Sequence, residues 1–288
     1  MLVASTRHVE DCPDLGPACA QKPGPTPYVH HVDLFASELG LDASYGIAPW
    51  LALEARLGLR IVKITPTYSE LDGTPKSVPN DIHHHDETLV GPTDPWLVVR
   101  TGGALGKLVT AARLGVTLPL GRTEPDPYVL AAAGQSHEHI QFGTGTVVPI
   151  VGGGLAYRAA PVELSLSALA FFSLYANDKG FRAPSRWLLS TRATLPLGGG
   201  AFRPYVAADL THEGRETWHG APGSESTTRT DLLLGGGVSW EFAPPWSVDL
   251  GLRARTLHAA SGATFDYPGI LQLGLSTHFG LERVAGAK

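Results

Sequence analysis

The chain has 288 residues, a net charge of −5 and only 17% charged residues. This charge argues against a nucleic-acid partner, and no apolar run reaches the roughly 18 residues that predict a transmembrane helix. The 34 glycines and 23 prolines are suited to turns and to curved strands.

The N-terminal segment, residues 1–27, is polar and rich in proline and glycine at its end. It predicts an irregular lead-in or a plug, and it lacks the pattern of a signal peptide. Cys12 and Cys19 both lie in this segment. Their spacing is compatible with a small disulfide loop in an oxidising compartment, and equally with two free thiols.

The stretch 50–64 shows the clearest period of two. In a strand, successive side chains point to opposite faces. One face here is purely apolar, while the other carries Glu54, Arg56 and Arg60. A tilted strand needs about 9–11 residues to cross the hydrocarbon of a membrane, and this stretch is longer. It therefore predicts the wall of a membrane β-barrel.

Ten further segments with strand character accompany it along the chain. The eleven expected strands are 31–45, 50–64, 94–102, 107–118, 147–158, 162–176, 185–197, 202–212, 228–242, 246–258 and 269–279. Bacterial barrels usually have an even number of strands. We therefore expect a twelfth strand within 1–27 or within 119–146; the alternative is an N-terminus that enters from the lumen.

The connections between these strands alternate in length. The short ones are 46–49, 102–106, 159–161, 198–201 and 243–245, and the long ones are 65–93, 119–146, 177–184, 213–227 and 259–268. Bacterial outer-membrane barrels have short periplasmic turns and longer extracellular loops. The predicted fold is thus all-β, a single up-and-down antiparallel transmembrane β-barrel of about 12 strands over 28–280, with a C-terminal tail at 281–288.

A soluble β-sandwich would show the same alternation. The length of the strands and the asymmetry of the loops favour the membrane instead. Five tryptophans near strand ends also fit an interfacial aromatic girdle; they are Trp50, Trp96, Trp187, Trp240 and Trp246.

Four segments carry a resemblance to a known family. They are GPTDPWLVVRT at 91–101, LPLGRTEPDP at 118–127, HIQFGTGTVVP at 139–149 and LGLSTHFG at 273–280. They resemble the outer-membrane β-barrel "transporter" family of the meta-pathway of phenol degradation, over most of the chain from about residue 28. The resemblance implies a Gram-negative outer-membrane protein for porin-like transport of small, often aromatic, hydrophobic compounds, without agreed catalytic residues.

The polar faces of the strands define the predicted inner wall. Its lumen-lining candidates are Glu54, Arg56, Arg60, Arg113, Glu163, Arg192, Asp209, Asp231, Glu241, Asp249, Arg253 and Arg255. Both signs are present, and buried charges must be paired. Cross-strand pairing is therefore favoured over charge rings that select solutes.

Histidines gather with carboxylates in two long connections. His83, His84, His85 and Asp86 lie in one, and His137 and His139 lie in the next. Imidazole and carboxylate ligands suit Zn²⁺ or Cu²⁺. No spacing here matches a defined metal motif, so this candidate is compositional, and otherwise we expect no cofactor.

The sequence lacks the usual motifs of nucleotide binding and of hydrolase chemistry. Ser136, His137 and Asp126 lie near the same predicted end of the barrel, but sequence alone does not bring them together. The prediction is a non-enzymatic, passive channel in the bacterial outer membrane, with the lipid bilayer and a small aromatic or hydrophobic solute as partners. The alternatives are a barrel enzyme acting on lipid or peptide, and a metal-capturing surface protein that uses the His-rich loops.

Overall fold

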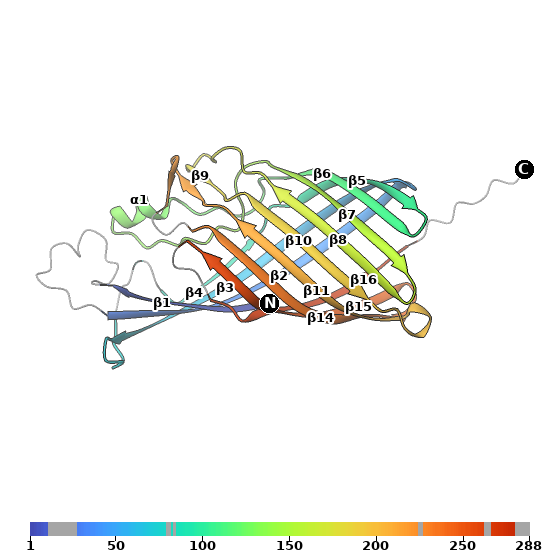
Figure 1. The fold of residues 1–288 in the computed structure, drawn as a ribbon. Helices are drawn as coiled ribbons and strands as arrows, with labels where there is room; N and C mark the ends of the chain where they lie inside the picture. The colour runs from blue at the N-terminus through green and yellow to red at the C-terminus, as the bar shows by residue number, and fades with distance from the viewer. Residues whose placement is uncertain (11–27, 79–81, 83–84, 224–226, 262–265, 280–288) are drawn as a thin grey trace, which may run out of the picture.

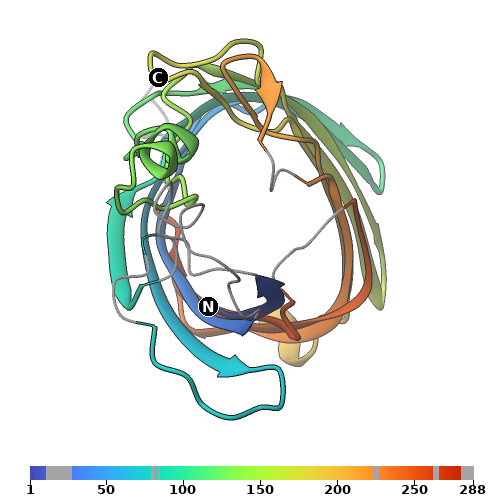
Figure 2. The same ribbon diagram turned by 90° about the vertical axis from the view of Figure 1, so that its left-hand side faces the viewer.

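The computed structural model describes residues 1–10, 28–78, 82, 85–223, 227–261 and 266–279. Its main feature is a ring of antiparallel strands, seen along its axis in Figure 2. The ring has twelve positions, because β4 and β5 both pair with β3 and together make one interrupted strand. The strands are β1 (Leu2–Glu10), β2 (Tyr28–Ala48), β3 (Leu51–Glu70), β4 (Glu87–Pro92), β5 (Trp96–Leu105), β6 (Leu108–Thr117), β7 (Val148–Ala159), β8 (Val162–Phe171), β10 (Arg186–Thr194), β11 (Phe202–Glu213), β14 (Arg229–Ala243), β15 (Trp246–Ala260) and β16 (Gly269–Thr277).

The N-terminus supplies the twelfth strand. Residues 2–10, expected to be irregular, form β1, which pairs with β2 along its whole length and closes the ring against β16 at Leu2 and Ile270. Both faces of β1 mix apolar and polar residues, so its alternation is too weak to be noticed. Cys12 and Cys19, with the rest of the expected lead-in at 11–27, lie outside the described residues, as does the tail at 281–288.

The two ends of the ring differ as predicted. Short turns join β2 to β3, β5 to β6, β7 to β8 and β14 to β15 at the right-hand end of Figure 1. The long connections gather at the other end. They contain a small sheet of β9 (Phe181–Arg182), β12 (Thr217–Trp218) and β13 (Ala221–Pro222). They also contain helix α1 (Pro127–Ala132), which lies within 119–146, the other segment in which a twelfth strand was expected.

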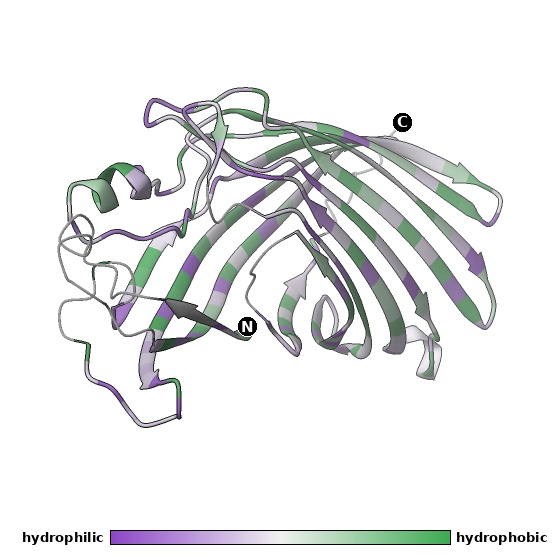
Figure 3. Ribbon diagram, turned by 60° about the vertical axis from the view of Figure 1, so that its left-hand side comes forward, coloured by the Kyte–Doolittle hydropathy of each residue, from purple (hydrophilic) through white to green (hydrophobic). Residues whose placement is uncertain are grey.

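The outer face of the ring is apolar over a limited height. On β3 the exposed leucines at 53, 57 and 59 and the exposed Ile61 alternate with half-buried polar groups, and Lys63 is the first charge beyond them. The ten steps from Leu51 to Ile61, at about 3.3 Å each and a tilt of about 40°, span about 25 Å. Figure 3 shows the same alternation of hydropathy along the strands.

Aromatic side chains lie at both limits of this apolar band. Trp50, Trp240 and Trp246 are exposed near the short turns, and Trp187 is exposed towards the loop end. The prediction for Trp96 is wrong. It shares the inner face with Arg56, whose guanidinium lies over its ring at 5.4 Å, and it packs on Phe171 with ring centroids 4.8 Å apart. No described helix is long and apolar enough to span a membrane.

Apolar side chains also line part of the inner face. One cluster lies towards the loop end and includes Val32, Leu34, Val62, Ile64, Leu89, Leu233, Phe142 and Tyr267. A second joins Val98, Val148, Ile150 and Phe171 from three other strands, with Trp96 packed against it. The predicted polar inner wall therefore describes the middle of the barrel better than its loop end.

Candidate functional site in the barrel interior and its loop mouth

Two carboxylates organise the charged wall of β2, β3, β5 and β6. Glu54 Oε1 accepts a hydrogen bond from Arg100 at 2.6 Å, and its Oε2 accepts one from Arg113 at 2.8 Å. On the next strand, Glu38 accepts from Arg56 at 2.9 Å and from Arg60 at 3.0 Å. Each of these two carboxylates thus meets two guanidinium groups. Asp42 also lies 3.6 Å from Arg56, so four guanidinium groups face three carboxylates in this part of the wall.

A second charged group occupies the other side of the ring. The Arg192 guanidinium lies over the ring of Tyr205 at 3.4 Å and donates to Asp249 at 3.2 Å. The Tyr205 hydroxyl also donates to Asp249, at 3.0 Å. Arg253 contacts the same ring at 5.4 Å and donates to Asp209 at 2.8 Å. Here the charges balance within the group.

Asp231 is fully buried at the loop end of β14 and collects several partners. It accepts hydrogen bonds from Tyr267 at 2.9 Å and pairs with His258 at 2.6 Å, while Arg229 and Arg255 lie at 3.3 and 3.8 Å. Burial, and then the hydrogen bond to Asp231, raise the pKa of Tyr267 to about 12. This group ties the connection before β16 to the wall.

The remaining two predicted wall residues lie near the short turns. Glu163 stands beside Arg158 on β7 and Thr194 on β10, and Glu241 is at the end of β14 opposite Ser247. Sequence reasoning missed Glu38 and Arg100, although each lies at the position that its own strand alternation assigns to the polar face.

Asp94 fixes the longest described connection to the wall. It sits at the break between β4 and β5 and is largely buried. One carboxylate oxygen accepts from the Gly121 amide at 2.8 Å, and the other accepts from the Thr144 amide and hydroxyl, each at 2.7 Å. An added Cβ at Gly121 or Gly143 would lie 2.7 Å from Asp94 Oδ1. Glycine is required there by this close approach.

Three of the four segments quoted for the family resemblance therefore meet in space. Segment 91–101 supplies Asp94, segment 118–127 supplies Gly121, and segment 139–149 supplies Thr144. Their shared task in this chain is structural, because the hydrogen bonds hold the connection between β6 and β7 against the barrel.

The structure describes four of the six residues proposed as metal ligands in the histidine-rich loops. His83 and His84 lie outside the described residues. Asp86 pairs with Lys63, while His137 and His139 contact each other with ring centroids 5.4 Å apart. His85 instead meets two carboxylates, with its Nε2 at 2.8 Å from Glu87 Oε2 and 3.3 Å from Glu138 Oε1.

The structure does not bring Ser136, His137 and Asp126 together as a nucleophile, base and acid. Asp126 caps α1 through the amides of Tyr128 and Val129, and it pairs with His219 at 3.0 Å. Ser136 Oγ lies 3.5 Å from Nε2 of His85, and His137 Nδ1 lies 3.0 Å from the Gln135 carbonyl oxygen.

Comparisons with known proteins agree with this architecture. No family model and no curated protein matches the chain. Among solved structures, the chain is similar to the crystal structure of an outer membrane channel from Pseudomonas putida F1, with a TM-score of 0.53 and 13% identity, over 95% of this chain and 92% of that one. The likeness confirms the predicted fold, a 12-stranded up-and-down antiparallel β-barrel.

Proposed function

We propose that the chain is an outer-membrane channel through which a small solute diffuses passively. The main support is a closed ring whose outer face is apolar over about 25 Å, the height of the apolar band in transmembrane barrels. A charged side chain that faced lipid at this height would be costly, whereas charges inside can pair with one another. The similar solved structure is itself an outer membrane channel.

The inner wall supports a proposal for the chemical class of the solute. Aromatic rings of Trp96, Phe171, Phe142 and Tyr267 belong to the two inner apolar clusters. Near the second cluster, four guanidinium groups meet the carboxylates of Glu38, Asp42 and Glu54, which leaves one positive charge in excess. Apolar rings beside positive charge suit a small organic anion with an aromatic part.

Single-channel recording tests the channel itself. Purified protein in a planar lipid bilayer should produce discrete conductance steps. In a KCl gradient, the sign of the reversal potential should show that chloride passes more readily than potassium. Detergent alone is the control. A correctly folded, inserted barrel that remains silent would overturn the proposal.

A variant of the positive wall tests the selectivity separately. Glu54→Gln frees Arg100 and Arg113 from their shared carboxylate and should increase the preference for anions. Glu70→Gln is the matched control, because Glu70 pairs with Lys76 at the far end of β3.

An uptake assay tests the aromatic part of the proposal. Liposomes that contain the protein should take up benzoate faster than acetate, relative to liposomes without it. Equal uptake of the two anions would remove the aromatic part of the proposal and leave the channel.

A further inference from the structure

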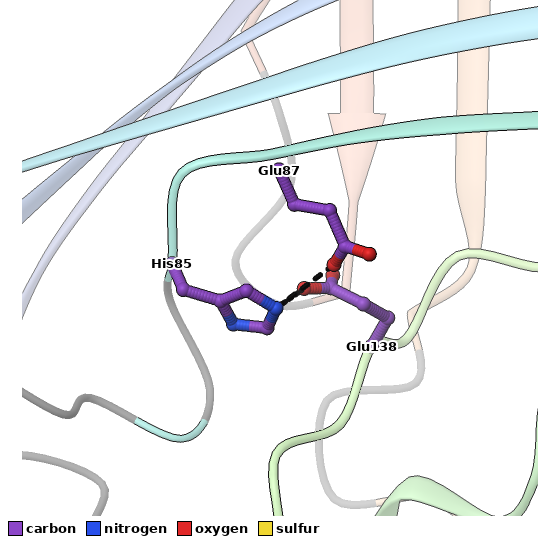
Figure 4. A group of neighbouring side chains, drawn as sticks. All are labelled: His85, Glu87 and Glu138. Carbon is purple, nitrogen blue, oxygen red and sulfur yellow. Dashed lines mark hydrogen bonds and ion pairs between the residues drawn. The ribbon is translucent and has the colours of Figure 1, made fainter.

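We propose that His85, Glu87 and Glu138 form a binding site for a divalent transition-metal ion of the zinc class. The three side chains point towards one another at the loop end of the barrel, as Figure 4 shows. This site concerns metal binding by the loops, and it stands whether or not the barrel conducts solutes.

The distances among the donor atoms are close to those of a metal-ligand set. One imidazole nitrogen and two carboxylate oxygens all lie within 4.8 Å of one another. Ligands at about 2.0–2.2 Å from a tetrahedral Zn²⁺ are separated by about 3.3–3.5 Å. The Nε2 atom of His85 is already 2.8 Å from one oxygen and 3.3 Å from the other. Small side-chain rotations would complete the geometry.

The single hydrogen that Nε2 of His85 can carry favours a metal ion over a simple ion pair. Nε2 of His85 faces carboxylate oxygens of both Glu87 and Glu138. A ring nitrogen carries at most one hydrogen, so it can donate a good hydrogen bond to only one of these oxygens at a time. A divalent cation would satisfy the nitrogen lone pair and both carboxylates together.

The surroundings can supply the remaining ligand. A cavity of about 270 Å³ adjoins the three side chains and is also lined by Glu124, Ser136 and His137. It has room for several water molecules, each of which takes about 30 Å³ in the liquid. A structure with three protein ligands and one open position is the usual form of a zinc site that exchanges its fourth ligand.

Metal binding here would fasten a connection to the wall. Glu87 begins β4, while Glu138 belongs to the connection between β6 and β7 that Asp94 also holds. Phe142 of the same connection packs into the inner apolar cluster. The ion would therefore hold an aromatic side chain in place over the lumen.

Titration of the full-length protein without a histidine tag tests the proposal. We expect one equivalent of Co²⁺ to bind and to give the visible d–d absorption of a cobalt ion in a ligand field of low symmetry. Zn²⁺ should displace the Co²⁺ and abolish this absorption, whereas Mg²⁺ should leave the absorption unchanged. Loss of an outer-shell partner already weakens metal sites about 10–100-fold, so Glu87→Gln and Glu138→Gln should each weaken Zn²⁺ binding by at least about 100-fold. Heat-modifiable electrophoretic mobility shows that each variant is folded.

Two controls distinguish binding at this site from non-specific attraction of metal cations by the charged, histidine-rich loops. Asp86→Asn removes a neighbouring charge that pairs with Lys63, and it should leave the affinity unchanged. A His83→Ala/His84→Ala double variant should also retain binding. Loss of binding in the double variant, retention in both glutamate variants, or wild-type protein without one-equivalent Co²⁺ binding would each overturn the proposal.

Discussion

Replacement of Asp94 by alanine is the sharpest test of how the loop end is built. The carboxylate accepts two amides and one hydroxyl from the connection between β6 and β7. After the change, the half-buried amides of Gly121 and Thr144 and the Thr144 hydroxyl lose their acceptor. A hydrogen bond to a charged group contributes about 1.5–3 kcal/mol, and water can partly replace the carboxylate at half-buried donors, so we expect the attached state of this connection to lose about 3–4 kcal/mol.

This loss should increase the population of the detached connection by roughly two to three orders of magnitude, since about 1.4 kcal/mol is a factor of ten. Trypsin cleavage after Arg122 measures it, because cleavage follows the open population when reclosing is fast. Asp72→Ala is the control: Asp72 accepts from Thr74 in an exposed turn. Cleavage of the Asp94 variant at the wild-type rate would refute this role for the carboxylate.

Leu57→Arg should destabilise the barrel in lipid vesicles by roughly 2–4 kcal/mol in urea unfolding, whereas Leu71→Arg in the turn beyond β3 should have little effect; equal effects would contradict a lipid-facing band. The pKa of Tyr267 is raised to about 12 in the folded protein, whereas the pKa of tyrosine in the unfolded chain is about 10. The neutral Tyr267 side chain therefore stabilises the fold below about pH 10, and this contribution is lost between about pH 10 and 12. Tyr267→Phe should therefore show a smaller fall in melting temperature over that window, and an unchanged fall would argue against the shift. Gly143→Ala places a Cβ 2.7 Å from the backbone of Gly121 in the same connection between β6 and β7, and it should release that connection to trypsin, while Gly103→Ala, which has open space around it, should not.

The strands of the barrel wall were predictable because lipid-facing and inward residues alternate. In β3 the period of two is unbroken from Leu51 to Ile61, so its position and its faces followed directly. The alternation reverses beyond Ile61, where the inward Val62 and Ile64 are apolar and the outward Lys63 is charged, and this part of the inner cluster was therefore missed. Trp96 was assigned to the girdle because strand ends attract tryptophan, but its register with Arg56 turns it inward.

The loop end was less accessible to sequence reasoning. Glu138 meets His85 across 53 positions of the chain, and no local period links the two. The runs of histidine drew attention to the right loops, but composition does not indicate which member faces a carboxylate. Asp94 lies in the segment 91–101 that was quoted for the family resemblance, yet its role depends on amides from two other segments. Contacts of this kind are set by tertiary structure.

The great length of β2 and β3 has a practical consequence for work on whole cells. Beyond Ile61 this hairpin continues for nine more residues, which at about 3.3 Å each and the same tilt carries it roughly 20 Å past the hydrocarbon boundary. The turn at 71–74 is exposed and lies at the tip of the β3 extension, away from the ring of strands. An epitope inserted at this turn would report, by antibody labelling of intact bacteria, which end of the protein faces the outside.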